Sequence, residues 1–138
     1  MKPTLLLLLI CAVSFAAGAE LDAIAARVNG DSILFSQLSA RTAPDIRPLR
    51  EKYKGKDLVD AVIKLRASHL NQMIDRLLLL QELKRQGFPL PAHATDKQID
   101  ATIRDRFSSN RQQWLRRLKP KAAIKIFYSF PSATWERG

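Results

Sequence analysis

The chain has 138 residues, the length of one domain, and a single cysteine, which excludes a fold held together by internal disulfides. Lys and Arg number 23 against 13 Asp and Glu, giving a net charge of +10 at pH 7. A surface this basic suits nucleic acid, an anionic membrane surface or an acidic polypeptide as partner.

Residues 1–19 have the organisation of a secretory signal peptide. Lys2 provides a positive start, residues 4–16 are apolar but short for a membrane span, and Ala17-Gly18-Ala19 is a small-residue cleavage site. The cysteine, Cys11, lies inside this segment, so the chain after cleavage has no thiol nucleophile and no cysteine metal site. An uncleaved membrane anchor is the alternative interpretation of the same segment.

Export narrows the choice of partner. An exported protein is separated from nucleic acid, so we expect no nucleic-acid partner in the cell. After cleavage we also expect no membrane span. The absence of cysteine from residues 20–138 suits export, because no thiol is left to oxidise.

Residues 21–34 are predicted to form a β-hairpin. Apolar residues alternate with others along its first half, and Asn29-Gly30 is a preferred pair for a two-residue type I′ turn. A two-stranded ribbon is only marginally stable alone, so this hairpin needs a third strand or a covering helix.

Two short helices are predicted next. Ser36 can cap the first, which would stop near Pro44, and the second would run from Pro48 to Tyr53 and end at Gly55. The sequence around the second helix is strongly basic, which is typical of a solvated face.

Residues 57–87 are predicted to form one long helix that organises the rest of the chain. Asp57 is a suitable N-cap, Gly87 suits the left-handed residue that ends a helix, and no Pro or Gly lies between them. Such a helix is either covered on two sides or leaves apolar surface for a guest. Its main apolar face comprises Val59, Ile63, Leu70, Met73, Ile74 and Leu77, widened by Val62, Leu80, Ala67 and Leu78. A second strip on nearly the opposite side comprises Leu65, Leu79 and Leu83.

A proline-containing loop and two further helices follow. Thr95 and Gln98 form the signature of a capping box at the start of the first helix. Ser108-Ser109-Asn110 breaks or weakens the pattern, and residues 111–118 are helical again until Pro120 stops them.

The last predicted element is a strand at residues 122–128, which supplies the third strand that the hairpin needs. The predicted fold is therefore mainly α with a small antiparallel β-sheet, in which the N-terminal hairpin pairs with the C-terminal strand. Residues 20–130 would form a single domain and residues 131–138 a frayed tail. The side chains expected to meet in the core of the sheet are Ile24, Ala26, Val28, Ile124 and Ile126.

The order of these elements resembles that of the SurA-type periplasmic chaperones. Three stretches carry the resemblance, namely IAARVNGDSILFSQL, LNQMIDRLLLLQELKRQGFPLPAHATDKQIDATI and WLRRLKPKAAIKIF. The resemblance implies a multi-helical, periplasmic chaperone module similar to the N-terminal domain of these proteins and to the peptide-binding domain of trigger factor. It also implies that the terminal strand returns to the hairpin.

One feature departs from that family. A parvulin-type prolyl isomerase domain usually lies between the capped helix and the terminal helix, and it needs about 100 residues. Only ten residues separate Ile103 from Trp114 here, and nothing matches the histidine-containing motifs of that domain. We therefore expect the chaperone module without the isomerase.

The sequence lacks the patterns of an enzyme. His69 lies on the long helix without a carboxylate or histidine four residues away, and His93 lies in a loop with prolines. No zinc-protease, nucleophile-elbow, P-loop or dinucleotide motif occurs. We expect no catalytic residue, no cofactor and no metal.

The leading functional hypothesis is a holdase that binds unfolded or β-rich client polypeptides, such as outer-membrane protein precursors. The residues predicted to contact the client are Leu65, Leu79, Leu83, Phe88 and Trp114. The competing interpretation is that this second strip is ordinary core. Two other functions stay open, an adaptor with one dedicated partner or a homodimer, and a basic binder of nucleic acid or membrane surfaces. A remnant of a longer gene is a further alternative.

Export predicts a defined N-terminus. Mass spectrometry of the protein recovered from the cell envelope should show a chain that begins at Glu20, because cleavage is expected after Ala19. A form that retains Met1 and accumulates in the cytoplasm would contradict the prediction of export.

Overall fold

The computed structural model describes residues 22–127. In chain order these form β1 (Ile24–Val28), β2 (Asp31–Leu34), α1 (Phe35–Lys52), α2 (Gly55–Arg85), α3 (Asp96–Phe107), α4 (Arg111–Leu118), a 3₁₀ turn (Lys119–Lys121) and β3 (Ile124–Ile126). The predicted signal peptide, its cleavage site and the predicted tail at residues 131–138 lie outside the described residues.

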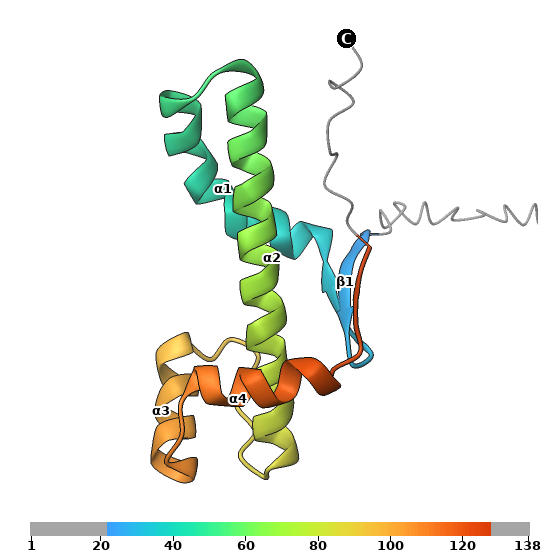
Figure 1. Ribbon diagram of the computed structural model, residues 1–138, viewed down its shortest axis with the longest axis vertical. Helices are drawn as coiled ribbons and strands as arrows, with labels where there is room; N and C mark the ends of the chain where they lie inside the picture. The colour runs from blue at the N-terminus through green and yellow to red at the C-terminus, as the bar shows by residue number, and fades with distance from the viewer. Residues whose placement is uncertain (1–21, 128–138) are drawn as a thin grey trace, which may run out of the picture.

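Helix α2 is the axis of the molecule (Figure 1). The sheet lies beside its middle, and α3 and α4 lie at its C-terminal end. At the other end, α2 and the second half of α1 project together as a two-helix arm, which we define as residues 43–69. The predicted fold class, mainly α with a small antiparallel sheet, is confirmed.

The three strands form one antiparallel sheet in the order β2-β1-β3. Asn29 and Gly30 both have positive φ, 50° and 92°, as the predicted type I′ turn requires. β3 pairs with β1, so the predicted return of the C-terminal strand to the hairpin is confirmed. Asn29 anchors this pairing, because its N–H donates to the Ala123 carbonyl at 2.9 Å and its side-chain oxygen accepts from the Ala123 N–H at 2.8 Å.

The predicted inward position of Ile124 and Ile126 is wrong. Their side chains are 37% and 51% exposed, whereas Val28 and Ala26, which lie opposite them on β1, are fully buried. Opposed residues share one side of a sheet, so the two isoleucines do face the same side as their partners. They stay exposed because β3 is an edge strand and the helices pack on β1 rather than on β3. Ile24 is half-buried beside an irregularity in the β1–β2 register.

Helix α1 runs unbroken through Pro44 and Pro48, where the sequence predicted two short helices. Each proline removes one backbone donor and crowds the carbonyl four residues before it. Ala40 and both prolines are exposed, so water can bind the carbonyls that lose their helical partners. The helix accommodates the prolines by changing direction along its length (Figure 1), and packing against α2 holds both parts.

The start of α1 is also capped differently from the prediction. Ser36 lies inside the helix, and the N-cap position belongs to Leu34. Asp22 accepts hydrogen bonds from the Ser36 N–H at 3.2 Å and from the Ser36 hydroxyl. Gln37 accepts from the Leu34 N–H at 2.9 Å. Asp22, which lies fourteen residues before Ser36 in the chain, therefore caps the start of the helix, where a local cap was predicted.

The predicted end of the long helix is confirmed in detail. Gly87 has a φ of +87°, the left-handed conformation that a side chain disfavours. The Phe88 N–H donates to the Leu83 carbonyl at 2.9 Å and the Gly87 N–H to the Lys84 carbonyl at 3.1 Å, which together form a Schellman motif. At the other end the N-cap is Lys54, and Asp57, the predicted cap, lies in the first turn.

Two separate cores form along α2, which at 1.5 Å per residue is about 46 Å long. The sheet core joins α2 to the strands and to the start of α1, and its buried members are Ala25, Ala26, Val28, Ile33, Leu38, Leu70, Ile74 and Leu78. The end core joins the last turns of α2 to α3 and α4, and its buried members are Leu79, Leu83, Ala94, Ile99, Ile103 and Trp114. The C-terminal half of α2 is therefore covered on two sides, as predicted for a central helix.

Removing a buried leucine from this half of α2 should cost far more than removing an exposed apolar side chain from the arm. Leu79→Ala is expected to lower the free energy of unfolding by about 2–5 kcal/mol, because Leu79 is fully buried. Val59→Ala is the matched control, since Val59 is 44% exposed, and should change it by about 0.5 kcal/mol or less. Urea unfolding followed by circular dichroism measures both, and similar losses in the two variants would contradict the assignment of the cores.

Candidate functional site

The strip predicted to contact clients is mostly core. Leu79, Leu83 and Trp114 are no more than 1% exposed, so the open groove predicted at this place is absent. The physical reason is that α3 and α4 fold over this side of α2 and bury the three side chains together in the end core. Phe88 is 36% exposed and follows the C-terminal end of α2, whereas Leu65 is half-buried in the N-terminal half of that helix, so the two are far apart.

A row of aromatic rings connects Phe88 to this core. Its ring lies edge-on to Phe107 with a centroid distance of 5.4 Å, and Phe107 lies 4.9 Å from Trp114 in the same manner. Arg106 lies over the outer face of Phe88 at 5.3 Å. Phe88 thus forms the rim of the end core rather than one wall of a groove.

A network of charged side chains holds α3 and α4 against α2. Arg76 of α2 donates to Asp96 at 3.1 Å and to the Ala92 carbonyl at 2.9 Å. Arg111 of α4 approaches Asp96 at 3.4 Å and donates to Asp100 at 2.8 Å. Asp96 therefore joins three helices, and we call the group of Arg76, Asp96, Asp100 and Arg111 the clasp.

The clasp shifts the ionisation of Asp96. Partial burial acts to raise the pKa of its carboxyl, but the charge of Arg111 and hydrogen bonds from Arg76 and Arg111 outweigh burial and hold the pKa below its ordinary value of 3.8. A carboxyl with a depressed pKa stabilises the fold while it is ionised. Its contribution is present above about pH 4 and is lost as the pH falls through the depressed value.

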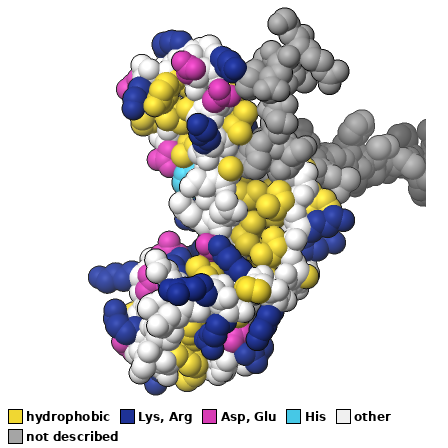
Figure 2. Space-filling model, in the orientation of Figure 1, with side chains coloured by type: hydrophobic (Ala, Val, Ile, Leu, Met, Phe, Trp, Pro, Cys, Tyr) yellow, Lys and Arg dark blue, Asp and Glu magenta, His cyan; other side chains and the backbone are white. Residues whose placement is uncertain are grey.

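The arm, in contrast, leaves its apolar side chains open. None of its residues is fully buried. Figure 2 shows hydrophobic side chains gathered on the arm, with basic and acidic groups around them. The large apolar and aromatic residues that are half-buried or exposed there are Ile46, Leu49, Tyr53, Leu58, Val59, Val62, Ile63 and Leu65.

Two hollows lie along α2 where α1 crosses it. The first, of about 270 Å³, is in the arm and is lined by Ile46, Arg50, Leu58, Val59, Val62, Ile63 and Arg66. The second, of about 250 Å³, is lined by Ser32, Ile33, Gln37, Arg41, Met73, Arg76, Leu77, Leu80 and Ala92. The α2 residues of both hollows share the helix face that the sequence predicted as the main apolar one. Leu70 and Ile74 of this face are buried in the sheet core, so its open surface is confined to the two hollows, and arginines border both of them.

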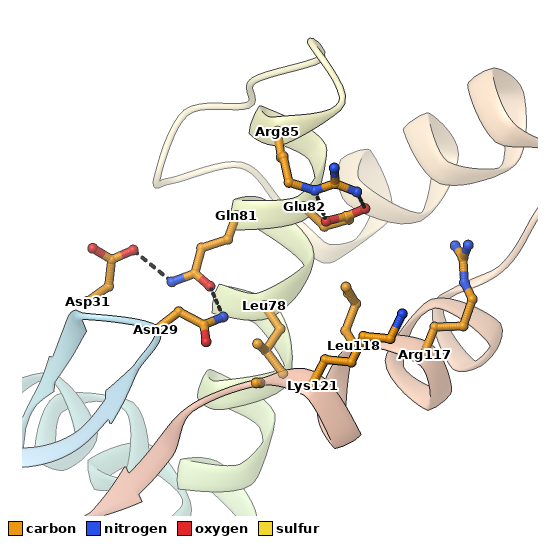
Figure 3. A pocket seen from close by; sticks show the side chains of 10 residues that line it. Asn29, Asp31, Leu78, Gln81, Glu82, Arg85, Arg117, Leu118 and Lys121 are labelled. Carbon is orange, nitrogen blue, oxygen red and sulfur yellow. Dashed lines mark hydrogen bonds and ion pairs between the residues drawn. The ribbon is translucent and has the colours of Figure 1, made fainter.

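A third hollow, of about 550 Å³, lies between the hairpin turn, α2 and the end of α4. Gln81 projects into it from α2 and donates to Asp31 at 2.7 Å, while Asn29 donates to Gln81 at 3.0 Å (Figure 3). Glu82 is held by Arg85 at 2.6 Å, and this hydrogen bond lowers the pKa of Glu82 against partial burial. The hydrogen bonds that join Gln81 to Asn29 and Asp31 tie the hairpin to α2 across this hollow.

The described residues contain no grouping that suggests catalysis by a metal. Among residues 22–127, no cluster of three or more His, Cys, Asp or Glu side chains could hold a metal ion. Within the same range, none of the helices combines the length and apolarity that crossing a bilayer requires.

The sequence matches the family of the SurA-like N-terminal domain over residues 3–121. The chain belongs to this family. No curated protein and no solved structure matches the chain. The SurA-like N-terminal domain is the non-catalytic chaperone part of proteins of the SurA type, so this chain carries a chaperone-type domain. The match covers every described helix, and β3 follows directly after it.

Sequence reasoning missed the contacts that join the elements of this SurA-like domain. His69 has a carboxylate partner after all, because Asp45 of α1 lies 2.9 Å from its Nε2 atom. The sequence separation is 24 residues, so no helical spacing rule could reveal the pair. Asp96 and Asp100 lie near the start of α3, and the structure pairs them with Arg76 and Arg111 from two other helices.

Lowering the pH should weaken the packing of α3 and α4 on α2, because Asp96 loses its charge. Between pH 5 and pH 2.5 the urea midpoint of the wild type should fall, and Asp96→Asn should lower the midpoint at pH 7 and flatten its pH dependence. Asp105→Asn is the matched control on the same helix, because Asp105 is 64% exposed and, among residues 22–127, pairs only with the adjacent Arg104. Equal pH dependence of the urea midpoint in the wild type and Asp96→Asn would show that the clasp does not stabilise the packing of α3 and α4 on α2.

Proposed function

We propose that this protein is an exported periplasmic chaperone that binds unfolded client polypeptides on the partly exposed apolar side chains of the arm. The clients are proposed to be β-rich chains such as outer-membrane protein precursors. The observation that carries the proposal is the arm, in which eight large apolar or aromatic side chains gather without one of them being fully buried. An apolar surface of this kind on a folded domain is typical of an interaction site.

Client capture is proposed to combine apolar contact with long-range attraction. Val59, Val62 and Ile63 offer apolar area in the arm hollow, and Arg50 and Arg66 border it. The excess of 23 basic over 13 acidic residues favours acidic segments of a client. Apolar contact is not screened by salt, whereas attraction between exposed charges is. Salt should therefore weaken capture only in part.

The proposed module acts without prolyl isomerase activity. α3 ends at Phe107 and α4 begins at Arg111, so no domain is inserted where the related chaperones carry one. The described helices pack directly on one another across this junction, and Arg111 is tied to Asp100. We therefore assign to the described residues a polypeptide-binding surface and not a catalytic site.

Substitution in the arm should separate binding from folding. Val59→Asp is expected to leave the melting temperature nearly unchanged, because Val59 is 44% exposed. It should raise the chain concentration needed to suppress aggregation of a denatured outer-membrane β-barrel protein by about fivefold, the equivalent of about 1 kcal/mol of lost apolar contact. Light scattering after dilution from urea measures the effect.

Val59→Leu is the matched control, since it keeps an apolar side chain at the same position, and it should retain suppression. A wild-type chain that fails to suppress the aggregation of several unrelated clients would contradict the holdase proposal and favour an adaptor with one partner. Equal suppression by Val59→Asp and Val59→Leu would show that the arm is not the client surface.

A further inference from the structure

The outer edge of β3 has unpaired backbone groups. Ala123 and Phe127 both bond toward β1, through the Asn29 N–H to the Ala123 carbonyl and the Phe127 N–H to the Ala25 carbonyl, each at 2.9 Å. In an antiparallel ladder every second residue bonds to the same neighbour. Lys125 therefore also bonds toward β1, and the N–H and C=O groups of Ile124 and Ile126 point away from it. No strand among residues 22–127 lies on that outer side.

The side chains of the same two residues form an apolar stripe along this edge. Ile124 is 37% and Ile126 is 51% exposed, and they lie two residues apart on the same side of the sheet. Figure 2 shows a patch of hydrophobic side chains between α2 and the position of β3. The edge thus combines free backbone donors and acceptors with apolar side chains, which is what an incoming strand requires.

On the other face of the sheet, the side chains along this edge are basic. Lys125 lies directly across from Arg27 of β1, and both lie near the Phe127 ring, at 5.0 Å and 5.9 Å. Neither cation has a carboxylate partner among the described residues. Two like charges facing each other across a ladder are unfavourable, and an acidic side chain beside them would offset the repulsion.

This charge argues against a second copy of the chain as the occupant. If two β3 edges paired about a two-fold axis, Lys125 would face the Lys125 of the other copy in a non-hydrogen-bonded pair, where side chains are closest. The two chains would also bring together two surfaces with a large excess of positive charge. A lysine in the middle of an edge strand is a common protection against pairing of this kind.

We propose that β3 captures one extended client segment as an added fourth strand, and that the segment carries the pattern apolar–acidic–apolar. The apolar residues would lie beside Ile124 and Ile126, and the acidic residue would lie beside Lys125. This inference rests on the proposed chaperone function and names the client conformation that the sheet edge recognises. It concerns a surface separate from the arm, at the other side of the sheet core.

The test uses the chain comprising residues 20–138 and short blocked peptides followed by fluorescence anisotropy. A peptide with a central Val-Glu-Val should bind about three- to tenfold more tightly than the same peptide with Val-Lys-Val, as expected for exchanging an opposite-charge cross-strand pair for a like-charge one. Lys125→Glu should reverse this preference. Since Lys125 is exposed, the variant should fold as the wild type does, which its melting temperature checks.

Backbone pairing has its own control. N-methylation of the backbone nitrogens of the two valines should abolish binding if an antiparallel strand is added, because these N–H groups face Ile124 and Ile126, and the change removes donors while leaving the side chains unchanged. Equal binding of the methylated and unmethylated peptides, or unchanged preference in Lys125→Glu, would overturn the proposal. A dimer that is seen in sedimentation velocity and disrupted by Ile126→Asp would overturn it in favour of a second copy. Failure of the chaperone function itself would appear separately, as absence of aggregation suppression by the wild type.

Discussion

The fold depends on one constraint, namely that a single long helix is buried on two sides over its C-terminal half. Leu70, Ile74 and Leu78 face the sheet core, while Leu79 and Leu83 face the end core. Both the sheet and the pair of short helices bury their apolar side chains against this one helix. Because both pack on α2, the rest of the chain is positioned by that helix.

The same constraint explains why the arm is open. The two cores bury side chains of α2 from Leu70 onward. Only α1 therefore covers the turns of α2 that precede Leu70. Two helices cannot bury each other's apolar faces completely, and α1 contains two prolines that turn its direction. Polar contacts such as Asp45 with His69 fix the crossing of the helices. Apolar side chains beyond the crossing stay partly exposed, which is what a surface for unfolded chains requires.

Local signals were read correctly from the sequence. The Asn29-Gly30 turn, the Thr95–Gln98 capping box and the Gly87 helix end are each set by a few adjacent residues, and all three appear as predicted. The predicted helix end near Pro44 was wrong. A proline breaks most helices, but here tertiary packing and hydration of the freed carbonyls offset the free-energy cost of the lost hydrogen bond.

The site was harder to predict because it depends on which helix faces are covered. The sequence shows that α2 has two apolar sides, and periodicity does not say which side α3 and α4 bury. The strip of Leu79 and Leu83 is therefore core, and the open hollows lie beside Val59 and Met73 on the other side of α2. Ile124 and Ile126 lie on the same side of the sheet as Val28 and Ala26, but they are not buried as predicted, because their exposure depends on how far the helices extend across the sheet. Such information lies in long-range packing and not in the residues themselves.

Hydrogen exchange along α2 can compare the open arm with the two cores within one helix, because α2 passes from the first into the second. Amides of residues 70–83 should exchange only through global unfolding, whereas those of residues 56–69 should exchange much faster through local opening of the arm. We expect a clear step in protection near Leu70. Uniform protection from one end of α2 to the other would contradict this expectation, since the arm would then be as firmly held as the cores.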